Sequence, residues 1–158
     1  MKNESLIILT DQLNTIDIHF KRIDYIADNI STFLPFTASA IENTSCLQQV
    51  FCDVLLYRFT HLQYTMTVKV LPRYLEVTEK LTHRLSFIDE LNLLERLGII
   101  ESISQWKDLK DLRNTLSCEY YFQSAFYQAD VINQVWHSLP MIRACAERIK
   151  QRIALLSL

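Results

Sequence analysis

Turn-forming residues are scarce in this chain. Its 158 residues include one glycine, Gly98, and three prolines, Pro35, Pro72 and Pro140. A sheet protein of this size needs many tight turns, which glycine and proline commonly supply. The scarcity therefore argues against an all-β or α/β fold and predicts an all-α fold, a mostly antiparallel bundle of about five helices. The length fits a single domain over residues 1–158.

The sequence also lacks a strong net charge, paired cysteines and long apolar runs. Its 16 basic and 18 acidic residues leave a net charge of −2, so no global field attracts DNA or an anionic membrane. The four cysteines form no CxxC pair and no metal-ligand spacing, as is typical of reduced thiols in the cytoplasm. Charged residues interrupt every apolar run before it reaches the roughly 20 residues of a membrane span. We therefore expect a cytoplasmic protein with no cofactor, no metal and no contact with membrane or DNA.

Apolar residues recur with helical spacing at both ends of the chain. Intervals of three and four residues predict a long amphipathic helix at each end. Pro140 is expected to kink the second of these helices or to break it. The two series are Leu6, Leu9, Leu13, Ile16, Phe20, Ile23, Ala27, Ile30 and Leu34, and Ile132, Val135, Leu139, Ile142, Ala146, Ile149, Ile153 and Leu156.

Capping residues predict the helices between these two. The stretch 43–45 supplies side chains that favour a helix start, and the apolar pattern after it predicts a helix ending near Pro72. Residues 73–85 carry no clear pattern. Ser86, with Asp89 three residues later, predicts the start of a short helix.

Gly98 occupies the position at which a left-handed residue would end that short helix. Ser102 or Ser104 is suited to begin the next helix, which presents Trp106 and Tyr120 on one side. The four histidines stand far apart in the sequence. We expect each of them to be a surface or partly buried polar side chain.

A series of motifs runs from residue 94 to residue 120. The turn reads Leu-Glu-Arg-Leu-Gly-Ile-Ile-Glu-Ser over 94–102, followed by Trp106 and by Leu-Lys-Asp-Leu-Arg-Asn over 109–114. This region resembles the core of the HEPN superfamily, in particular its HepT-like members. Relatives carry "LEKLG" and then a tryptophan helix ending in Arg-Asn, whose arginine begins the motif Arg-x4-His-x-Tyr. In this chain Arg113 and Tyr120 fill the outer positions of that motif.

The resemblance continues upstream over residues 58–72. The segment 58–63 reads Arg-Phe-Thr-His-Leu-Gln and the segment 69–72 reads Lys-Val-Leu-Pro, as in an "R-F-x-x-L-Q-D … K-L-x-P" stretch of relatives. Tyr64 departs from the aspartate of that pattern. Together the matching stretches span about residues 58–121.

The resemblance implies a homodimeric helical bundle that binds and cuts RNA. In the family, the motif arginine and histidine of both protomers face each other in a positively charged cleft. Cleavage through the ribose 2′-hydroxyl needs a group that exchanges protons and a cation that stabilises the phosphorane. Carried onto this sequence, the catalytic positions are Arg113, Asn114 and Cys118.

Cys118 stands where the family has its histidine. A thiol has an unperturbed pKa of about 8.5 and is a poor hydrogen-bond partner for a ribose hydroxyl or a leaving alkoxide. We therefore expect a degenerate endoribonuclease with weakened catalysis. A thiolate activated by Arg113 is an alternative, as is a small buried residue that fills the space of the histidine.

Tyr120 has a second implied role. In HepT-like toxins the motif tyrosine is nucleotidylated by a partner, a minimal nucleotidyltransferase that acts as antitoxin. A phenol on an exposed helix end is suited to attack an α-phosphate. The alternative is an aromatic anchor that packs the helix end. A second hypothesis for the whole protein follows, in which the chain is a non-catalytic substrate-binding or regulatory subunit of such a nucleotidyltransferase.

Replacing Cys118 by histidine tests the interpretation of the motif. We expect the wild-type protein to cut single-stranded RNA poorly or not at all and Cys118→His to raise the rate, because imidazole restores proton transfer near neutral pH. Cleavage of labelled RNA by wild type, Cys118→His and Cys118→His/Arg113→Ala measures this. Robust wild-type cleavage that Arg113→Ala abolishes would show that the cysteine is sufficient.

Overall fold

The computed structural model describes residues 2–116, 120 and 123–156, and every element in this part of the chain is a helix. The predicted all-α fold is confirmed. The long elements are α1 (Lys2–Ile30), α3 (Cys46–Tyr64), α4 (Leu71–Glu79), α5 (Phe87–Arg96), α6 (Ile103–Leu116) and α7 (Ala125–Leu156). The short elements are the 3-10 turn η1 (Ser31–Phe33), helix α2 (Ala38–Asn43) and the π-helical turn η2 (Thr65–Val70).

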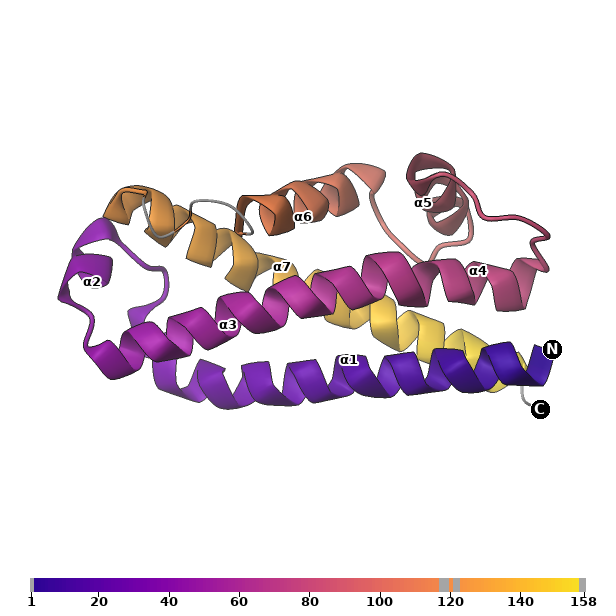
Figure 1. Cartoon of the computed structure of the whole chain (residues 1–158), viewed down its shortest axis with the longest axis horizontal. Coiled ribbons are helices and arrows are strands. Elements are labelled where there is room, and N and C mark those ends of the chain that lie inside the picture. Colours follow the sequence, from indigo (N-terminus) through magenta and orange to yellow (C-terminus); the bar gives the residue numbers. More distant parts are fainter. Residues whose placement is uncertain (1, 117–119, 121–122, 157–158) are drawn as a thin grey trace.

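The long helices run alternately up and down the bundle. In Figure 1, α1 leaves the N-terminus, the rod α3–η2–α4 returns beside it, α6 runs back, and α7 returns to the end where the chain began. Helix α5 lies across the end of α6, next to α4. The antiparallel arrangement follows from short connections between amphipathic helices.

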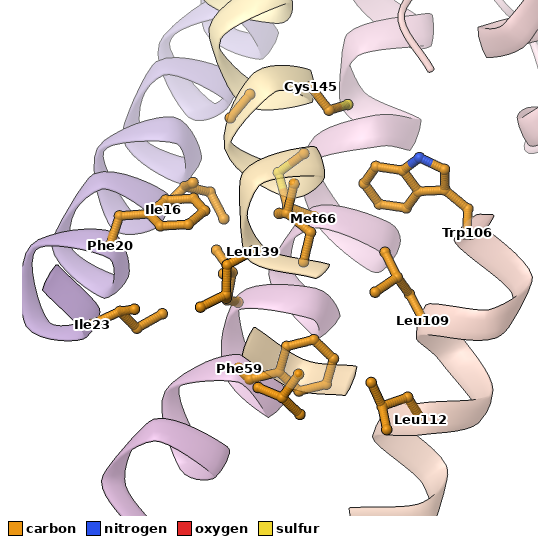
Figure 2. Close-up of a cluster of buried hydrophobic side chains, with 14 of the residues drawn as sticks. Ile16, Phe20, Ile23, Phe59, Met66, Trp106, Leu109, Leu112, Leu139 and Cys145 are labelled. Atoms are coloured by element: carbon orange, nitrogen blue, oxygen red, sulfur yellow. The ribbon is translucent and has the colours of Figure 1, made fainter. Parts of the chain in front are cut away.

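One hydrophobic core lies between α1, α3, α6 and α7 (Figure 2). The predicted seams of α1 and α7 form much of it, because residues three and four positions apart share a helix face. The ends of the seams differ from the prediction, since Leu34 lies beyond α1 and Leu156 is 49% exposed. Within α1, Ile26 is buried, whereas Ala27 is only half-buried. The buried face of α1 is shifted by one residue at this point, so that the larger side chain of Ile26 occupies the core in place of Ala27.

The capping predictions are confirmed. The Ser45 hydroxyl accepts the Gln48 amide and the Gln48 side chain accepts the Ser45 amide, a reciprocal capping box. The Ser86 hydroxyl accepts the amide of Asp89 at 3.2 Å. Gly98 has a φ of +71°, in the left-handed region that ends helix α5.

The prediction that a helix ends near Pro72 is wrong. The helix from Cys46 continues through η2 into α4 and stops only at Lys80, which has a φ of +52°. A proline inside an α-helix removes one i→i−4 hydrogen bond and clashes with the carbonyl of residue i−4. The π-helical turn shifts the bonding pattern just before Pro72, so that the amide of Leu71 donates to the carbonyl of Met66.

The predicted break at Pro140 does not occur either. Helix α7 is continuous from Ala125 to Leu156 with Pro140 inside it. Loss of an internal hydrogen bond at proline costs about 3 kcal/mol. Leu139 and Ile142, on either side of the proline, are buried in the core, and burial of large aliphatic side chains recovers about 1.5–3 kcal/mol each.

Candidate functional site

Arg113 lies in the last turn of α6 and reaches across to the end of α3. Its guanidinium carbon is 5.8 Å from the centre of the Tyr64 ring, and the Nζ of Lys69 is 5.9 Å from the same ring. Tyr64 remains 44% exposed. Two cations therefore flank one accessible aromatic ring, at a distance at which cation–π attraction operates.

Arg113 also lines a cavity of about 180 Å³ between α5, α6 and the η2–α4 rod. Lys110, one turn earlier on α6, lines the same cavity and places its Nζ 4.4 Å from the centre of the Phe87 ring. The remaining lining residues are Thr67, Val68, Arg84, Leu85, Phe87 and Glu90.

A second cavity, of about 410 Å³, adjoins the first. The two share Val68, Leu85, Arg84 and Glu90 as lining residues, and Lys69 lines the second. We call the two cavities together the basic groove, defined by the side chains of Lys69, Arg84, Lys110 and Arg113. Low-dielectric walls focus the potential of such a cluster even when the protein as a whole carries a slight negative charge.

The π-helical turn η2 forms one wall of this groove. Thr67 and Val68 of the turn line the cavity that holds Arg113, and the buried amide of Gln63 donates to the Thr67 hydroxyl at 2.8 Å. Single π-helical turns inside α-helices are rare and occur frequently at functional sites. The turn that carries the chain past Pro72 thus also shapes the groove.

The remaining predicted site residues are dispersed. Asn114 is exposed and does not line the cavity that holds Arg113, and Cys118 lies outside the described residues. Tyr120 is 4% exposed and its hydroxyl donates to the carbonyl of Gln128 at 3.4 Å. Of the two alternatives for Tyr120, the packed aromatic anchor agrees with this burial and the phenol on an exposed helix end does not.

Tyr120 does border open space, but not the space beside Arg113. It lines a cavity of about 480 Å³ together with Cys52, Asp53 and Gln128. Burial raises the pKa of the Cys52 thiol to about 11 and that of Cys145 to about 12, so both are protonated, unreactive thiols at neutral pH. This cavity offers no activated nucleophile among those cysteines.

A second polar cluster links α1 to α3. The rings of His19 and His61 are stacked with their centres 6.3 Å apart, and the ring of Tyr57 lies 4.3 Å from that of His61. The Nδ1 atom of His19 and the Nε atom of Arg58 are buried without a hydrogen-bond partner among the described residues. Burial, followed by the charges of Arg58 and His61, lowers the pKa of His19. Sequence reasoning missed this cluster because only the packing of α1 on α3 brings the two histidines together.

Glu90 is the other functional candidate that sequence reasoning missed. It lies on α5 with 6% of its surface exposed and lines both cavities of the basic groove. Burial raises the pKa of its carboxyl group, and Arg84 opposes that shift from 4.0 Å. In the sequence, Glu90 follows a capping serine, as acidic residues in the first turn of a helix ordinarily do. The sequence pattern therefore gave no sign that its side chain would be buried beside a cavity.

Comparison with protein-family models, with curated proteins and with solved structures finds no match to this chain. Within the described ranges, no cluster of three or more histidine, cysteine, aspartate or glutamate side chains could hold a metal ion. In the same part of the chain, no helix is both long enough and apolar enough to span a membrane.

The buried histidine predicts a pH dependence of stability. Because the pKa of His19 is lower in the folded chain than in the unfolded one, the unfolded state binds more protons as the pH falls through about 6.5. The free energy of unfolding should therefore decrease between pH 7.5 and pH 5.5. Urea denaturation at the two values should show a smaller decrease in His19→Gln.

The same substitution at His137, which is exposed on α7, provides the control. His137→Gln should retain the pH difference of the wild type. If the wild type and His19→Gln lose the same free energy of unfolding between the two pH values, protonation of His19 does not cause the pH dependence.

Proposed function

We propose that this chain is a HepT-like HEPN protein of toxin-antitoxin type, acting in the cytoplasm as a homodimeric RNA-binding module with weakened ribonuclease chemistry. The observation that carries the proposal is the basic groove around Arg113. The arginine of the motif, expected to contact phosphate, lies beside three further cations and an exposed aromatic ring.

Two cations of the groove, Lys69 and Lys110, are available for phosphate. Most basic side chains on α7, such as Arg143, Arg148 and Lys150, are held in salt bridges to nearby carboxylates. Lys69 and Lys110, by contrast, form no salt bridge with any described residue and rest on aromatic rings. A cation that is not neutralised releases counterions when it meets a phosphate, which is the main source of affinity for nucleic acid.

The exposed face of Tyr64 supports a single-stranded ligand. Unpaired bases stack on aromatic side chains, and each such contact contributes about 1–3 kcal/mol. Arg113 and Lys69 lie 5.8 and 5.9 Å from the centre of this ring, so a base that stacks on its exposed part would have its neighbouring phosphates within reach of both cations. A double helix does not offer a free base in this way.

Weakened cleavage follows from the chemistry of the motif. Arg113 can stabilise negative charge on a phosphate, but proton transfer at the ribose needs a second group. Cys118 is the residue at that position of the sequence. A thiol is a weak substitute for imidazole at neutral pH.

The alternative is a non-catalytic subunit that binds a minimal nucleotidyltransferase and no RNA. The buried hydroxyl of Tyr120, bonded to Gln128, would have to move outward before a partner enzyme could nucleotidylate it. The structure therefore offers less support for this alternative than for an RNA-binding groove. Failure of RNA binding would favour it.

Salt dependence of RNA binding tests the proposal. Affinity for a single-stranded RNA should fall steeply with salt, and Arg113→Ala should weaken binding and flatten the slope of log K against log salt by about one unit. Lys107→Ala is the matched control, because Lys107 lies on the same helix but is exposed and lines neither cavity. Fluorescence anisotropy between 50 and 200 mM salt, roughly the range over which such contacts weaken, measures both variants.

Two results would contradict the proposal. One is an affinity that barely changes with salt. The other is a folded Arg113→Ala protein that binds RNA as tightly as the wild type and Lys107→Ala do. Either result would leave the partner-subunit alternative as the better account.

A further inference from the structure

Glu90 occupies an unusual place in the basic groove. It is the buried carboxyl group at the junction of the two cavities, and it lines each of them. Its side chain is 7% exposed, and its nearest cation, the Nε of Arg84, is 4.0 Å away and belongs to a side chain that is 70% exposed. That separation is too long for a hydrogen bond.

The carboxyl group of Glu90 has no hydrogen-bond donor among the described residues. Other acidic side chains in the neighbourhood are satisfied: Asp89 accepts from the Ser86 hydroxyl and Glu76 accepts from Arg73. With no protein donor, the carboxyl oxygens of Glu90 depend on solvent in the groove for their hydrogen bonds, and a ligand that replaces this water must supply donors in its place. The open side of this carboxyl faces the groove, so a ligand is in a position to supply the donors.

A carboxylate also works against simple anion binding. Among Lys69, Arg84, Lys110 and Arg113, a single buried acid reduces the potential that attracts phosphate. Besides its ion pair with Arg84, it favours a ligand that combines a negative group with a neutral edge carrying N–H donors. Two adjacent donors in one plane match the two oxygens of a carboxylate.

Guanine is the nucleobase with that edge. Its ring N–H and its exocyclic amino group lie side by side, whereas adenine offers an acceptor beside its amino group. Single-stranded bases are read through hydrogen bonds to this edge when they enter a protein pocket. The larger cavity, about 410 Å³, falls within the range of small-molecule sites, roughly 300–1,000 Å³.

We propose that Glu90 is a base-specificity residue, which accepts the paired N–H donors of a guanine whose phosphate lies among the cations of the basic groove. This deepens the proposed RNA-binding function by naming the preferred base. The same chemistry is offered by a free guanine nucleotide and by a guanine within a strand. Gln12 is a further polar residue that lines the larger cavity, and its buried Oε1 has no hydrogen-bond partner among the described residues.

The test compares three nucleotides on the full-length protein. Guanosine 5′-monophosphate offers two adjacent donors and inosine 5′-monophosphate offers the ring N–H alone, whereas adenosine 5′-monophosphate offers one donor beside an acceptor that repels a carboxylate. Calorimetry should therefore rank their affinities in that order. A bidentate base contact corresponds to roughly tenfold or greater discrimination between guanine and adenine. The same comparison with hexanucleotides of otherwise uniform sequence, each containing one guanine or one adenine, separates a strand from a free nucleotide.

Glu90→Gln supplies a readout that a purely structural role would not change. The amide keeps the size of the side chain but presents one acceptor and one donor, the pattern that pairs with adenine, so the preference should disappear or shift toward adenine. Glu79→Gln is the matched control, because it makes the same change of charge on the adjoining helix α4 but Glu79 is exposed and lines neither cavity. It should keep the guanine preference, and thermal unfolding confirms that both variants are folded.

The outcomes distinguish this inference from the proposed function. A guanine preference seen with free nucleotide or only within the hexanucleotide, and lost in Glu90→Gln, supports the site and identifies its source. Equal binding of all bases, or a preference that survives Glu90→Gln, overturns the role of Glu90. Binding that ignores the base but still depends on salt and Arg113 would overturn only the role of Glu90 and leave the RNA-binding proposal standing.

Discussion

The packing of α6 against the continuous rod of α3, η2 and α4 is the constraint on which the rest of the structure depends. Trp106, Leu109 and Leu112 point from α6 toward Phe59 and Met66 of the rod (Figure 2). These side chains are buried, and each contributes on the order of 1.5–3 kcal/mol by leaving water. Because a helix is rigid over this length, the contact fixes where the last turn of α6, and hence Arg113, meets Tyr64.

The same constraint produces the electrostatic character of the groove. Helix α5 is joined to α6 through the Gly98 turn and packs beside α4, which places Glu90 opposite the cations of α6 and of the π-helical turn. The chain thereby gathers the four cations of the basic groove, and Arg73 in its salt bridge to Glu76, around two cavities although its net charge is −2. The positive potential that attracts an anionic ligand to the groove comes from the local arrangement of these cations and not from the net charge of the protein.

Much of the fold could be predicted because it depends on local patterns. The seams of α1 and α7, the caps at Ser45 and Ser86 and the left-handed Gly98 each follow from spacing or from the chemistry of one side chain. Pro72 misled the prediction because a π-helical turn can absorb a proline that would end an ordinary helix. No simple residue pattern predicts a π-helical turn.

The site was less accessible to sequence reasoning. Arg113 could be singled out from the motif, and Lys110 lies one turn before it on the same helix. Glu90 and the pair His19 and His61 depend on which helices pack together, and that is set by the whole core. For Tyr120 the sequence left an exposed phenol and a packed aromatic anchor open, because its position in the motif does not reveal that its side chain is buried.

Photocrosslinking tests the central claim most directly. A single-stranded RNA carrying 4-thiouridine is irradiated with the native protein, and the modified peptides are identified by mass spectrometry. The account predicts adducts at Tyr64 or within the adjoining turn Thr65–Val70, next to Arg113. Adducts confined to the outer face of α1 or to α7, or no adduct at all under conditions in which RNA binds, would contradict it.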